Sequence, residues 1–393
     1  MKKLTVLGAT GSIGLNALNV ASQHPDKFKI FALSCNTKVA ELADQCKQFK
    51  PSFAVVYDIS KMQELEALLE IFSPNTKVLS GIDGLCKIAS DPSVDIVIAA
   101  IVGSAGLLPT LEAAKSGKKV LLANKESLVM AGSLLINAVS ESKGILLPID
   151  SEHNAIFQCL PNNYTSSKSS GVRKVILTAS GGPFRTLDIN KMSEITVEQA
   201  CNHPNWKMGK KISVDSATMM NKGLELIEAC WLFGLSPDEI EVVVHPQSII
   251  HSMVEYLDGS VLAQLGNPDM RTPIAHALAW PERVSSGVNS LDIISTARLD
   301  FESPNLEKFP CLSLAISAAK AGGSAPITLN ASNEIAVEAF LNKQIFFTQI
   351  PEVVALVLKE MTPIEPNTLN AVQVCDRNSR ELTQKLITKY FIR

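Results

Sequence analysis

The sequence lacks three features that would each point to a particular class of protein. Its eight cysteines are scattered without a Cys-x-x-Cys pair, which argues against a zinc or redox motif and predicts reduced thiols in the cytoplasm. No apolar run reaches the roughly 20 residues that span a bilayer, so we expect no membrane partner. A net charge of −3 over 393 residues leaves no overall basic character, so nucleic acid is not an expected partner either.

The composition that remains is that of an ordinary globular protein. Hydrophobic residues make up 46% of the chain and charged residues 19%, which is enough to bury a core. The length favours roughly two to three domains. Lys2 and Lys3 precede a short apolar run, as in a signal peptide, but Gly8 interrupts that run at once, so we expect no leader.

A glycine-rich turn near the start of the sequence predicts a nucleotide site. A buried strand is expected at 4–7, and Gly8-Ala9-Thr10-Gly11-Ser12-Ile13-Gly14 leads from it into a helix at 15–22. Glycines let backbone N–H groups approach a pyrophosphate at the positive end of such a helix. The G-x-x-G-x-x-G spacing is weak by itself, and its position between strand and helix supports the assignment. The alternative is a glycine turn without a ligand.

The end of the second expected strand, at 28–33, favours NADPH over NADH. An NAD site would place Asp or Glu there to bind the ribose 2′-hydroxyl. The sequence has Ser34, Asn36, Thr37 and Lys38 instead, which are donors suited to a 2′-phosphate. If these residues only begin a loop, the selectivity argument fails and the nucleotide site remains.

Strands and helices alternate through the first 149 residues. Further strands are expected at 53–57, 95–100 and 119–122, and helices at 62–72 and 107–116. This alternation predicts an α/β fold with a doubly wound, Rossmann-like parallel sheet that binds ligands at the carboxyl ends of its strands. Asn124, Lys125 and Glu126 follow one strand at that edge. The alternative for them is an N-cap at Asn124, with Lys125 and Glu126 in solvent.

Asp150-Ser151-Glu152-His153-Asn154 lies where an apolar run passes into an amphipathic segment, which predicts a strand-to-helix corner. Asp150 and Glu152 are two residues apart and share one side of an extended backbone. Two carboxylates without an adjacent soft ligand suit a hard cation such as Mg²⁺ or Mn²⁺. The alternative is a helix start with Asp150 or Ser151 as the N-cap.

Two segments in the middle of the chain predict phosphate binding and a lid. After a strand expected at 175–178, the turn Ser180-Gly181-Gly182 offers amides and a hydroxyl to a phosphate. The loop that holds His203, Trp206 and Gly209 combines an aromatic residue with helix breakers, which suits a mobile lid. The alternative is a surface loop in which Trp206 packs on its own domain.

The run 215–225 is the most polar in the sequence. Ser216, Asn221 and Lys222 are donors of the kind that bind phosphate, and Glu225 lies one helical turn after Asn221, so both can face one side. Glu225 is therefore a candidate third carboxylate for the metal, whereas the alternative is an exposed helix acid. We interpret His245 and His251, which flank the next segment, as structural residues or as residues that support the ligands, and not as metal ligands.

Helical periodicity dominates the C-terminal part. Helices are expected at 312–321, 331–343, 350–361 and 368–388, and we interpret Asn330-Ala331-Ser332-Asn333-Glu334 as an N-cap. The predicted organisation is an NADPH-binding domain at 1–149, a central α+β catalytic domain at 150–280, a linker at 281–310 and a C-terminal helical bundle at 311–393.

In order along the chain, these motifs resemble those of the 1-deoxy-D-xylulose 5-phosphate reductoisomerase family. The matching segments are Asn124-Lys125-Glu126, Asp150-Ser151-Glu152-His153-Asn154, Ser180-Gly181-Gly182-Pro183-Phe184, His203-Pro204-Asn205-Trp206, Asn221-Lys222-Gly223-Leu224-Glu225, His245-Pro246-Gln247-Ser248 and Pro268-Asp269-Met270-Arg271. With Gly8 before them and Asn330–Glu334 after them, they cover essentially the whole chain and are highly specific.

The resemblance implies an enzyme that uses NADPH and Mg²⁺ or Mn²⁺ to rearrange and reduce 1-deoxy-D-xylulose 5-phosphate, a small phosphorylated sugar, to 2-C-methyl-D-erythritol 4-phosphate in the non-mevalonate isoprenoid pathway. It also implies a homodimer. The implied metal ligands are Asp150, Glu152 and Glu225, and Lys125 and His203 join them as catalytic residues. The implied substrate ligands are Lys125, Ser151, Glu152, Ser180, His203, Ser216, Asn221, Lys222 and Glu225. The implied cofactor contacts are Thr10, Gly11, Ser12, Ile13, Asn36, Asn124, Glu126 and Gly209.

The sequence departs from the family pattern in one place, and two other functions are also considered. Some relatives have Gly-Lys-Asn where this sequence has Asn36-Thr37-Lys38, so the 2′-phosphate contacts stay open. One rival is a related enzyme that acts on another phosphorylated hydroxyketone. The other is an inactive NADPH-binding sensor, which the presence of all three carboxylates and Lys222 disfavours.

Overall fold

The computed structural model describes residues 1–204, 206 and 208–391 and divides the chain into two compact units. Unit 1 comprises 1–127, 133–154 and 269–290, and unit 2 comprises 128–132, 155–268 and 291–393. Asn205 and Lys207, which belong to the expected lid, lie outside the described residues. Within the described part of the chain, no helix has the length and apolar character needed to cross a membrane.

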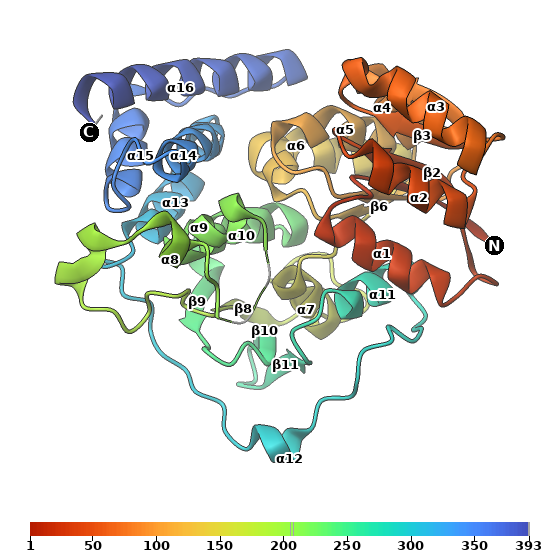
Figure 1. The fold of residues 1–393 in the computed structure, drawn as a ribbon. Coiled ribbons are helices and arrows are strands. Elements are labelled where there is room, and N and C mark those ends of the chain that lie inside the picture. The colour runs from red at the N-terminus through yellow and green to blue at the C-terminus, as the bar shows by residue number, and fades with distance from the viewer. Residues whose placement is uncertain (205, 207, 392–393) are drawn as a thin grey trace. The chain divides into compact units, whose positions relative to one another are not determined.

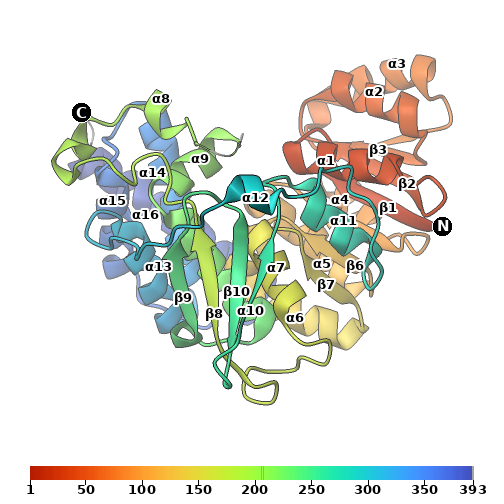
Figure 2. The same cartoon turned by 90° about the horizontal axis from the view of Figure 1, so that it is seen from below.

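Unit 1 is built on a seven-stranded sheet with the order β4-β3-β2-β1-β5-β6-β7, and every pairing is parallel (Figures 1 and 2). Its strands are β1 (Lys2–Leu7), β2 (Phe28–Cys35), β3 (Phe53–Val56), β4 (Lys77–Ser80), β5 (Ile96–Ala99), β6 (Lys119–Leu122) and β7 (Ile145–Pro148). The order reverses beside β1, as in doubly wound sheets. The predicted Rossmann-like sheet is confirmed.

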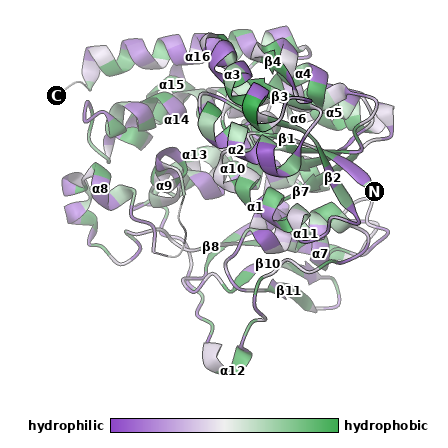
Figure 3. Ribbon diagram, turned by 45° about the vertical axis from the view of Figure 1, so that its right-hand side comes forward, coloured by the Kyte–Doolittle hydropathy of each residue, from purple (hydrophilic) through white to green (hydrophobic). Residues whose placement is uncertain are grey.

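Helices connect these strands. They are α1 (Ser12–Ser22), α2 (Val39–Phe49), α3 (Met62–Phe72), α4 (Gly81–Ser90), α5 (Leu107–Lys115), α6 (Lys125–Ser142) and the first turn of α7 (Ser151–Cys159), with short 3₁₀ turns η1 (Ile59–Lys61) and η2 (Ser104–Gly106). All four residues of β5 are buried, as expected for a strand that is covered on both faces. Figure 3 accordingly colours much of this sheet as hydrophobic.

A late segment of the chain completes unit 1. α11 (Arg271–Ala279) contacts α1 and β6, and Lys119 Nζ donates hydrogen bonds to Leu278 O at 3.1 Å and Trp280 O at 3.0 Å. Burial lowers the pKa of Lys119 to about 8. The compact units therefore divide the chain differently from the expected domain limits at 149, 280 and 310, which stay a prediction.

Unit 2 contains a four-stranded mixed sheet with the order β11-β10-β8-β9 (Figure 2). Its strands are β8 (Val172–Ala179), β9 (Ile240–Val244), β10 (Ile250–Tyr256) and β11 (Val261–Leu265). β8 is parallel to β9, whereas β10 is antiparallel to both β8 and β11. The parallel pair places the ends of β8 and β9 at one edge, where Ala179 aligns with Val244.

The helices of unit 2 pack around this sheet and beside it. They are α8 (Val197–Ala200), α9 (Lys210–Ala217), α10 (Met220–Phe233), α12 (Ile293–Thr296), α13 (Pro310–Ala321), α14 (Ala325–Leu341), α15 (Gln349–Glu360) and α16 (Leu369–Tyr390), with 3₁₀ turns η3 (Ile189–Glu194) and η4 (Pro237–Glu239). The predicted helices α13 to α16 are confirmed. One hydrophobic core joins them to α9 and α10.

The interpretation of residues 330–334 as an N-cap is wrong. They lie in the middle of α14, which begins at Ala325 with a proline in its first turn. Asn330, Ser332 and Asn333 are fully buried there. The polar cluster looked like a helix start because Ser and Asn favour caps, but here these side chains have partners within unit 2.

We expect Phe340→Ala to destabilise unit 2 by about 3–5 kcal/mol, because it leaves a cavity in a well-packed core. Phe340 is buried, and its ring meets that of Phe347 edge-on at 5.7 Å between centroids. The check is the melting temperature followed by circular dichroism. Phe346→Ala is the matched control, because Phe346 is 41% exposed and its loss should cost little. Equal losses from both variants would contradict this account of the core.

Candidate active site

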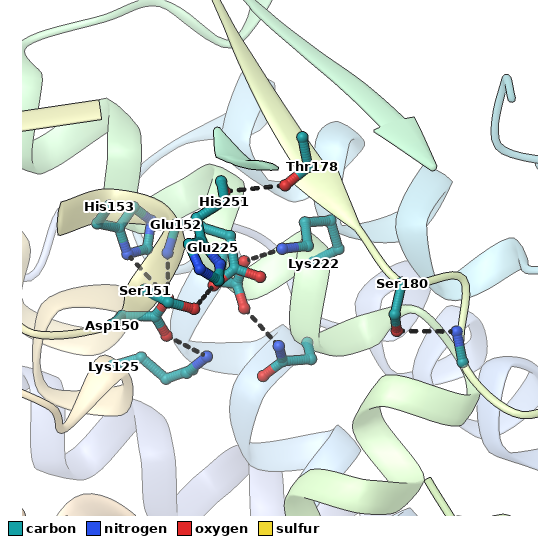
Figure 4. A network of polar contacts seen from close by, with 12 residues as sticks. Lys125, Asp150, Ser151, Glu152, His153, Thr178, Ser180, Lys222, Glu225 and His251 are labelled. Atoms are coloured by element: carbon teal, nitrogen blue, oxygen red, sulfur yellow. Dashed lines mark hydrogen bonds and ion pairs between the residues drawn. The ribbon is translucent and has the colours of Figure 1, made fainter. Parts of the chain in front are cut away.

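The predicted cluster in unit 1 follows from the parallel pairing of β6 and β7. Leu122 aligns with Pro148 in the ladder, so both strands end at the same edge of the sheet. α6 begins three residues after Leu122 and α7 begins three residues after Pro148. Lys125 and Asp150 thus meet, and Lys125 Nζ donates to Asp150 Oδ2 at 3.0 Å (Figure 4).

Asp150 and Glu152 do not share an extended backbone as the spacing argument assumed. The strand ends at Pro148, and Ser151 already begins α7. Asp150 Oδ1 accepts a hydrogen bond from Glu152 N at 3.3 Å, so the helix-start alternative describes the backbone correctly. Ser151 Oγ donates to Glu152 Oε2 at 2.5 Å, and both side chains are half-buried. The two carboxylates still lie at one helix start.

Asn124 acts as the N-cap that was the alternative for its segment. Its Oδ1 accepts from Ser127 N at 2.7 Å, and its Nδ2 donates to Ile101 O and to Gly103 O, the latter at 2.9 Å. The rest of that alternative does not hold, because Lys125 and Glu126 are buried and not in solvent. A contact of Asn124 or Glu126 with a cofactor stays a prediction.

The glycine turn after β1 forms an open helix start. Gly8 has φ +84°, and a Cβ there would lie 2.7 Å from Ala100 O on the neighbouring strand connection. A Cβ on Gly14 would lie 2.4 Å from Gly8 O. No side chain caps α1 at Gly11, and Thr10, Gly11, Ser12 and Ile13 are exposed or half-buried. This is a cradle for an anion.

The loop after β2 divides into a structural residue and three exposed ones. Ser34 is buried, and its hydroxyl accepts from Gly8 N at 3.0 Å, so it holds the glycine turn. Asn36, Thr37 and Lys38 are exposed. They are the donors that remain for a 2′-phosphate.

In unit 2, Ser180 and His203 are brought together. Ser180 follows β8 in a turn whose Gly181 and Gly182 both have positive φ. Ser180 Oγ lies 3.0 Å from His203 Nε2 and accepts from Gly182 N at 3.2 Å. A residue that looked like part of a lid therefore contacts the candidate phosphate turn.

The hydrogen bonds of His203 fix its tautomer. Trp206 N donates to His203 Nδ1 at 3.0 Å, so Nδ1 carries a lone pair and Nε2 carries the proton that it donates to Ser180 Oγ. Burial lowers the pKa of His203, which favours this neutral form. With two donors directed at its oxygen, the hydroxyl of Ser180 keeps its own proton for a further acceptor.

The polar run of unit 2 forms the start of α10. Asn221 Nδ2 donates to the carboxylate of Glu225, and the spacing of these two residues predicts that they face one side of the helix. Lys222 Nζ donates to the same carboxylate, which is not predicted from the sequence (Figure 4). Lys222 is 4% exposed and Glu225 is 1% exposed, so Glu225 is not the exposed helix acid of the alternative. Ser216 lies in the last turn of α9, and Gly209 precedes that helix.

The side chain of His245 has structural contacts, as expected. His245 Nδ1 lies 2.8 Å from Asp300 O, its Nε2 accepts from Ile249 N at 3.2 Å, and its ring stacks on Phe301. The backbone O of His251 accepts from Thr178 Oγ1 at 2.8 Å (Figure 4).

Sequence reasoning missed two side chains near the site. His153 is fully buried, with Nδ1 3.8 Å from Asp150 Oδ1. Its position three residues after Asp150 in a helix was the available signal. Asn333 donates to Asp215 Oδ1 at 2.8 Å, and no local pattern indicates a partner 118 positions away.

Taken separately, the two units offer complementary chemistry. Unit 1 holds an ammonium beside two carboxylates, and an anion cradle at the switch point of its sheet. Unit 2 holds a hydroxyl in a glycine turn and a buried carboxylate with two N–H donors. Carboxylate oxygens are the ligands of hard divalent cations, and the glycine turn suits a phosphate.

Models of one protein family match most of the sequence. The model described as 1-deoxy-D-xylulose 5-phosphate reductoisomerase matches residues 4–132. The C-terminal domain models of the same enzyme match residues 146–233 and 265–382.

Curated relatives and solved structures agree with these matches. The 1-deoxy-D-xylulose 5-phosphate reductoisomerase of Cellvibrio japonicus (strain Ueda107) is 58% identical over 394 residues, which cover 99% of each chain. That of Stutzerimonas stutzeri (strain A1501) is 57% identical and covers 97% of this chain and 96% of its own. A crystal structure of DOX-P reductoisomerase with NADPH, fosmidomycin and magnesium is 48% identical, covers 99% of each chain and has a TM-score of 0.93. The enzyme of Zymomonas mobilis with NADPH is 48% identical, covers 98% of each chain and has a TM-score of 0.91.

The Ser180–His203–Trp206 contacts should depend on pH. Because burial lowers the pKa of His203 below its ordinary 6.5, the neutral form and its contacts are complete above 6.5 and are lost as the pH falls through the lower folded value. The check is an NMR titration of the imidazole C–H signals of His203, which the variant His203→Gln identifies. Trp206 fluorescence is followed over the same pH range. A midpoint at or above 6.5 would contradict the proposed tautomer and its contacts.

Proposed function

The chain belongs to the 1-deoxy-D-xylulose 5-phosphate reductoisomerase family, and we propose that it converts 1-deoxy-D-xylulose 5-phosphate to 2-C-methyl-D-erythritol 4-phosphate with NADPH and a divalent metal ion. The observation that carries this proposal is the contact of Lys125 with Asp150 beside Glu152, at the edge of a dinucleotide-type sheet. An acidic pair of this kind serves a metal-dependent rearrangement and the sheet serves a reductant, so one chain has the parts for both steps.

The cofactor proposal rests on the cradle after β1. Thr10, Gly11, Ser12 and Ile13 lie at a helix start without a side-chain cap, which suits a pyrophosphate, and Cβ atoms on Gly8 or Gly14 would collide with backbone atoms of this close turn. When bound, NADPH supplies the hydride that reduces the rearranged aldehyde. The exposed donors Asn36, Thr37 and Lys38 bind its 2′-phosphate.

Three carboxylates fit a hard cation. Asp150 and Glu152 of unit 1 and Glu225 of unit 2 would hold it, and oxygen ligands of this kind suit either Mg²⁺ or Mn²⁺. The ion supplies a Lewis acid toward the ketone and a neighbouring hydroxyl of the substrate. Lys125 compensates Asp150 at 3.0 Å, and Lys125 and Ser151 bind the same end of the substrate.

The phosphate end of the substrate belongs to unit 2. Ser180 donates its free hydroxyl proton to a phosphate oxygen, and Ser216, Asn221 and Lys222 complete the grip. An ammonium carries three N–H donors, so Lys222 can hold Glu225 and a phosphate oxygen at the same time. Binding energy from this remote group orients the carbons that rearrange.

The lid loop covers the substrate and excludes water. His203 contacts Ser180, so its closure is tied to the phosphate turn, and Trp206 is fixed to His203 by its backbone N–H. Gly209 is the N-cap of α9 at the cofactor end of the loop, and a Cβ on it would meet open space. Asn124 and Glu126 bind NADPH near Lys125.

The same proposal includes a cytoplasmic homodimer with a functional division at 149, 280 and 310. The free thiols of all eight cysteines support a reducing compartment. β11 is an edge strand, and its Val261 and Leu262 are 48% and 51% exposed, which supports a partner on that edge. In the described stretch 281–309 the regular structure is limited to α12 and an isolated bridge, which supports a linker.

Glu225→Gln should lower metal-dependent turnover by more than about 100-fold, because removal of outer-shell partners alone reaches that range. NADPH binding, followed by cofactor fluorescence, should stay near normal, since the cradle lies in unit 1. NADPH oxidation is measured with Mg²⁺, with EDTA and after metal is restored. Loss of NADPH binding in this variant, or turnover that persists in EDTA, would refute the metal assignment.

Lys222→Ala should raise the KM for 1-deoxy-D-xylulose 5-phosphate about 10- to 100-fold, as expected for the loss of a hydrogen bond to a charged group. The phosphate-free sugar 1-deoxy-D-xylulose is the comparison, because it lacks the group that Lys222 binds. Competition between the two sugars gives both affinities. If both weaken equally, Lys222 does not bind the phosphate.

A further inference from the structure

The helix that carries Ser216 is anchored to the C-terminal helices by a buried polar contact. Asp215 lies in the last turn of α9 and is 1% exposed. Its Oδ1 accepts a hydrogen bond of 2.8 Å from Nδ2 of Asn333, which is 0% exposed and lies in the middle of α14. This contact joins the residue next to a proposed phosphate ligand to a helix far along the chain.

The charge of Asp215 is compensated within α9 itself. Lys211 Nζ lies 2.9 Å from Asp215 Oδ2, one helical turn earlier. The side chain of Lys211 is 22% exposed and that of Asp215 is 1% exposed, and the lost hydration of the buried carboxylate offsets much of what the ion pair adds to stability. The ion pair with Lys211 instead fixes the orientation of the Asp215 carboxylate, so that its other oxygen faces Asn333 in α14.

The side-chain amide of Asn333 uses its N–H group as the donor to Asp215. Its Oδ1 has no hydrogen-bond partner among the residues that the structure describes. A buried carbonyl without a partner costs stability, and an apolar residue of similar size would avoid that cost. The unpaired Oδ1 of Asn333 therefore lowers the stability of the folded protein, while Nδ2 of the same amide binds Asp215.

Further contacts fix both sides of this link. In α14, Glu334 pairs with Arg380 of α16 at 2.6 Å, so the helix that carries Asn333 is held by its neighbour. At the other side, Thr218 Oγ1 donates to Asp215 O at 3.2 Å and accepts from Met220 N at 3.3 Å. The turn between α9 and α10 is thereby tied to Asp215.

α10 is packed closely against α13. A Cβ on Gly223 would lie 2.3 Å from Cβ of Ala315 in α13, so the two helices are in close contact beside Asn221 and Lys222. The C-terminal helices thus hold the α9–α10 corner on two sides. Ligands on a close-packed support are placed to within fractions of an ångström, which phosphate recognition requires.

We propose that Asp215 and Asn333 are positioning residues for the phosphate group of the substrate. Their contact sets the orientation of the last turn of α9, and with it the hydroxyl of Ser216 and the start of α10. Neither side chain binds the phosphate itself. This inference rests on the proposed function, in which Ser216, Asn221 and Lys222 are the phosphate ligands.

The first test is Asn333→Ala in the full-length enzyme. The KM for 1-deoxy-D-xylulose 5-phosphate should rise at least about tenfold, as for the loss of a hydrogen bond to a charged group. The KM for NADPH should not change. Ser332→Ala is the matched control, because Ser332 is also 0% exposed in α14 but donates to its own helix at Thr328 O and Leu329 O. The control should lower the melting temperature without raising the KM for the sugar.

The second test exchanges the two groups. Asp215→Asn alone should raise the KM for the sugar, because two amides face each other without the original charge. Combining it with Asn333→Asp places an amide N–H opposite a carboxylate again and leaves an amide oxygen facing Lys211. The KM should then fall back toward that of the unmodified enzyme, and this pair also serves if Asn333→Ala folds poorly.

The outcomes separate the inference from its premise. A KM for Asn333→Ala within about twofold of the unmodified enzyme, or an equal rise in Ser332→Ala, overturns the positioning role. Failure of the exchanged pair to recover the KM overturns it as well. If Lys222→Ala also leaves the KM unchanged, the phosphate site itself is wrong, which is a failure of the proposed function and not of the link alone.

Discussion

The chemistry of unit 1 depends on the parallel pairing of two neighbouring strands. β6 and β7 align Leu122 with Pro148, so both chains leave the sheet at the same edge and deliver Lys125 beside Asp150. A register slip of one residue would exchange the faces of the strand and separate the ammonium from the carboxylate. The glycine turn after β1 opens at the same edge for the same reason, because all strands of this sheet run in one direction.

Much of the fold could be predicted because the deciding signals are local. The helix at 62–72 and the strand at 119–122 have the predicted limits, since periodicity and turn residues bound them. Residues 330–334 show where this fails. Their Asn and Ser side chains favour a cap in isolation, and only the packed interior of unit 2 gives them partners within a helix. Tertiary contacts then override local preference.

The candidate site divides in the same way. The spacing of Asn221 and Glu225 predicts their contact, because i and i+4 positions meet on any helix. The contact of Lys222 with Glu225 is not among the sequence predictions. The bond between His203 and Ser180 could not be predicted, since it depends on how a loop folds back over a strand end. The sequence identifies a chemically suitable side chain, but the tertiary structure decides which partner that side chain reaches.

The late return of α11 to unit 1 has a consequence for synthesis of the chain. Lys119 of β6 finds its acceptors at Leu278 and Trp280, which are made after most of unit 2. A nascent chain therefore carries the seven strands of the unit 1 sheet without α11, and Lys119 lacks these acceptors while the intervening segment emerges from the ribosome. β6 is therefore completed by a segment that follows residues 155–268 of unit 2 in the chain, and α13 to α16 of unit 2 are made later still.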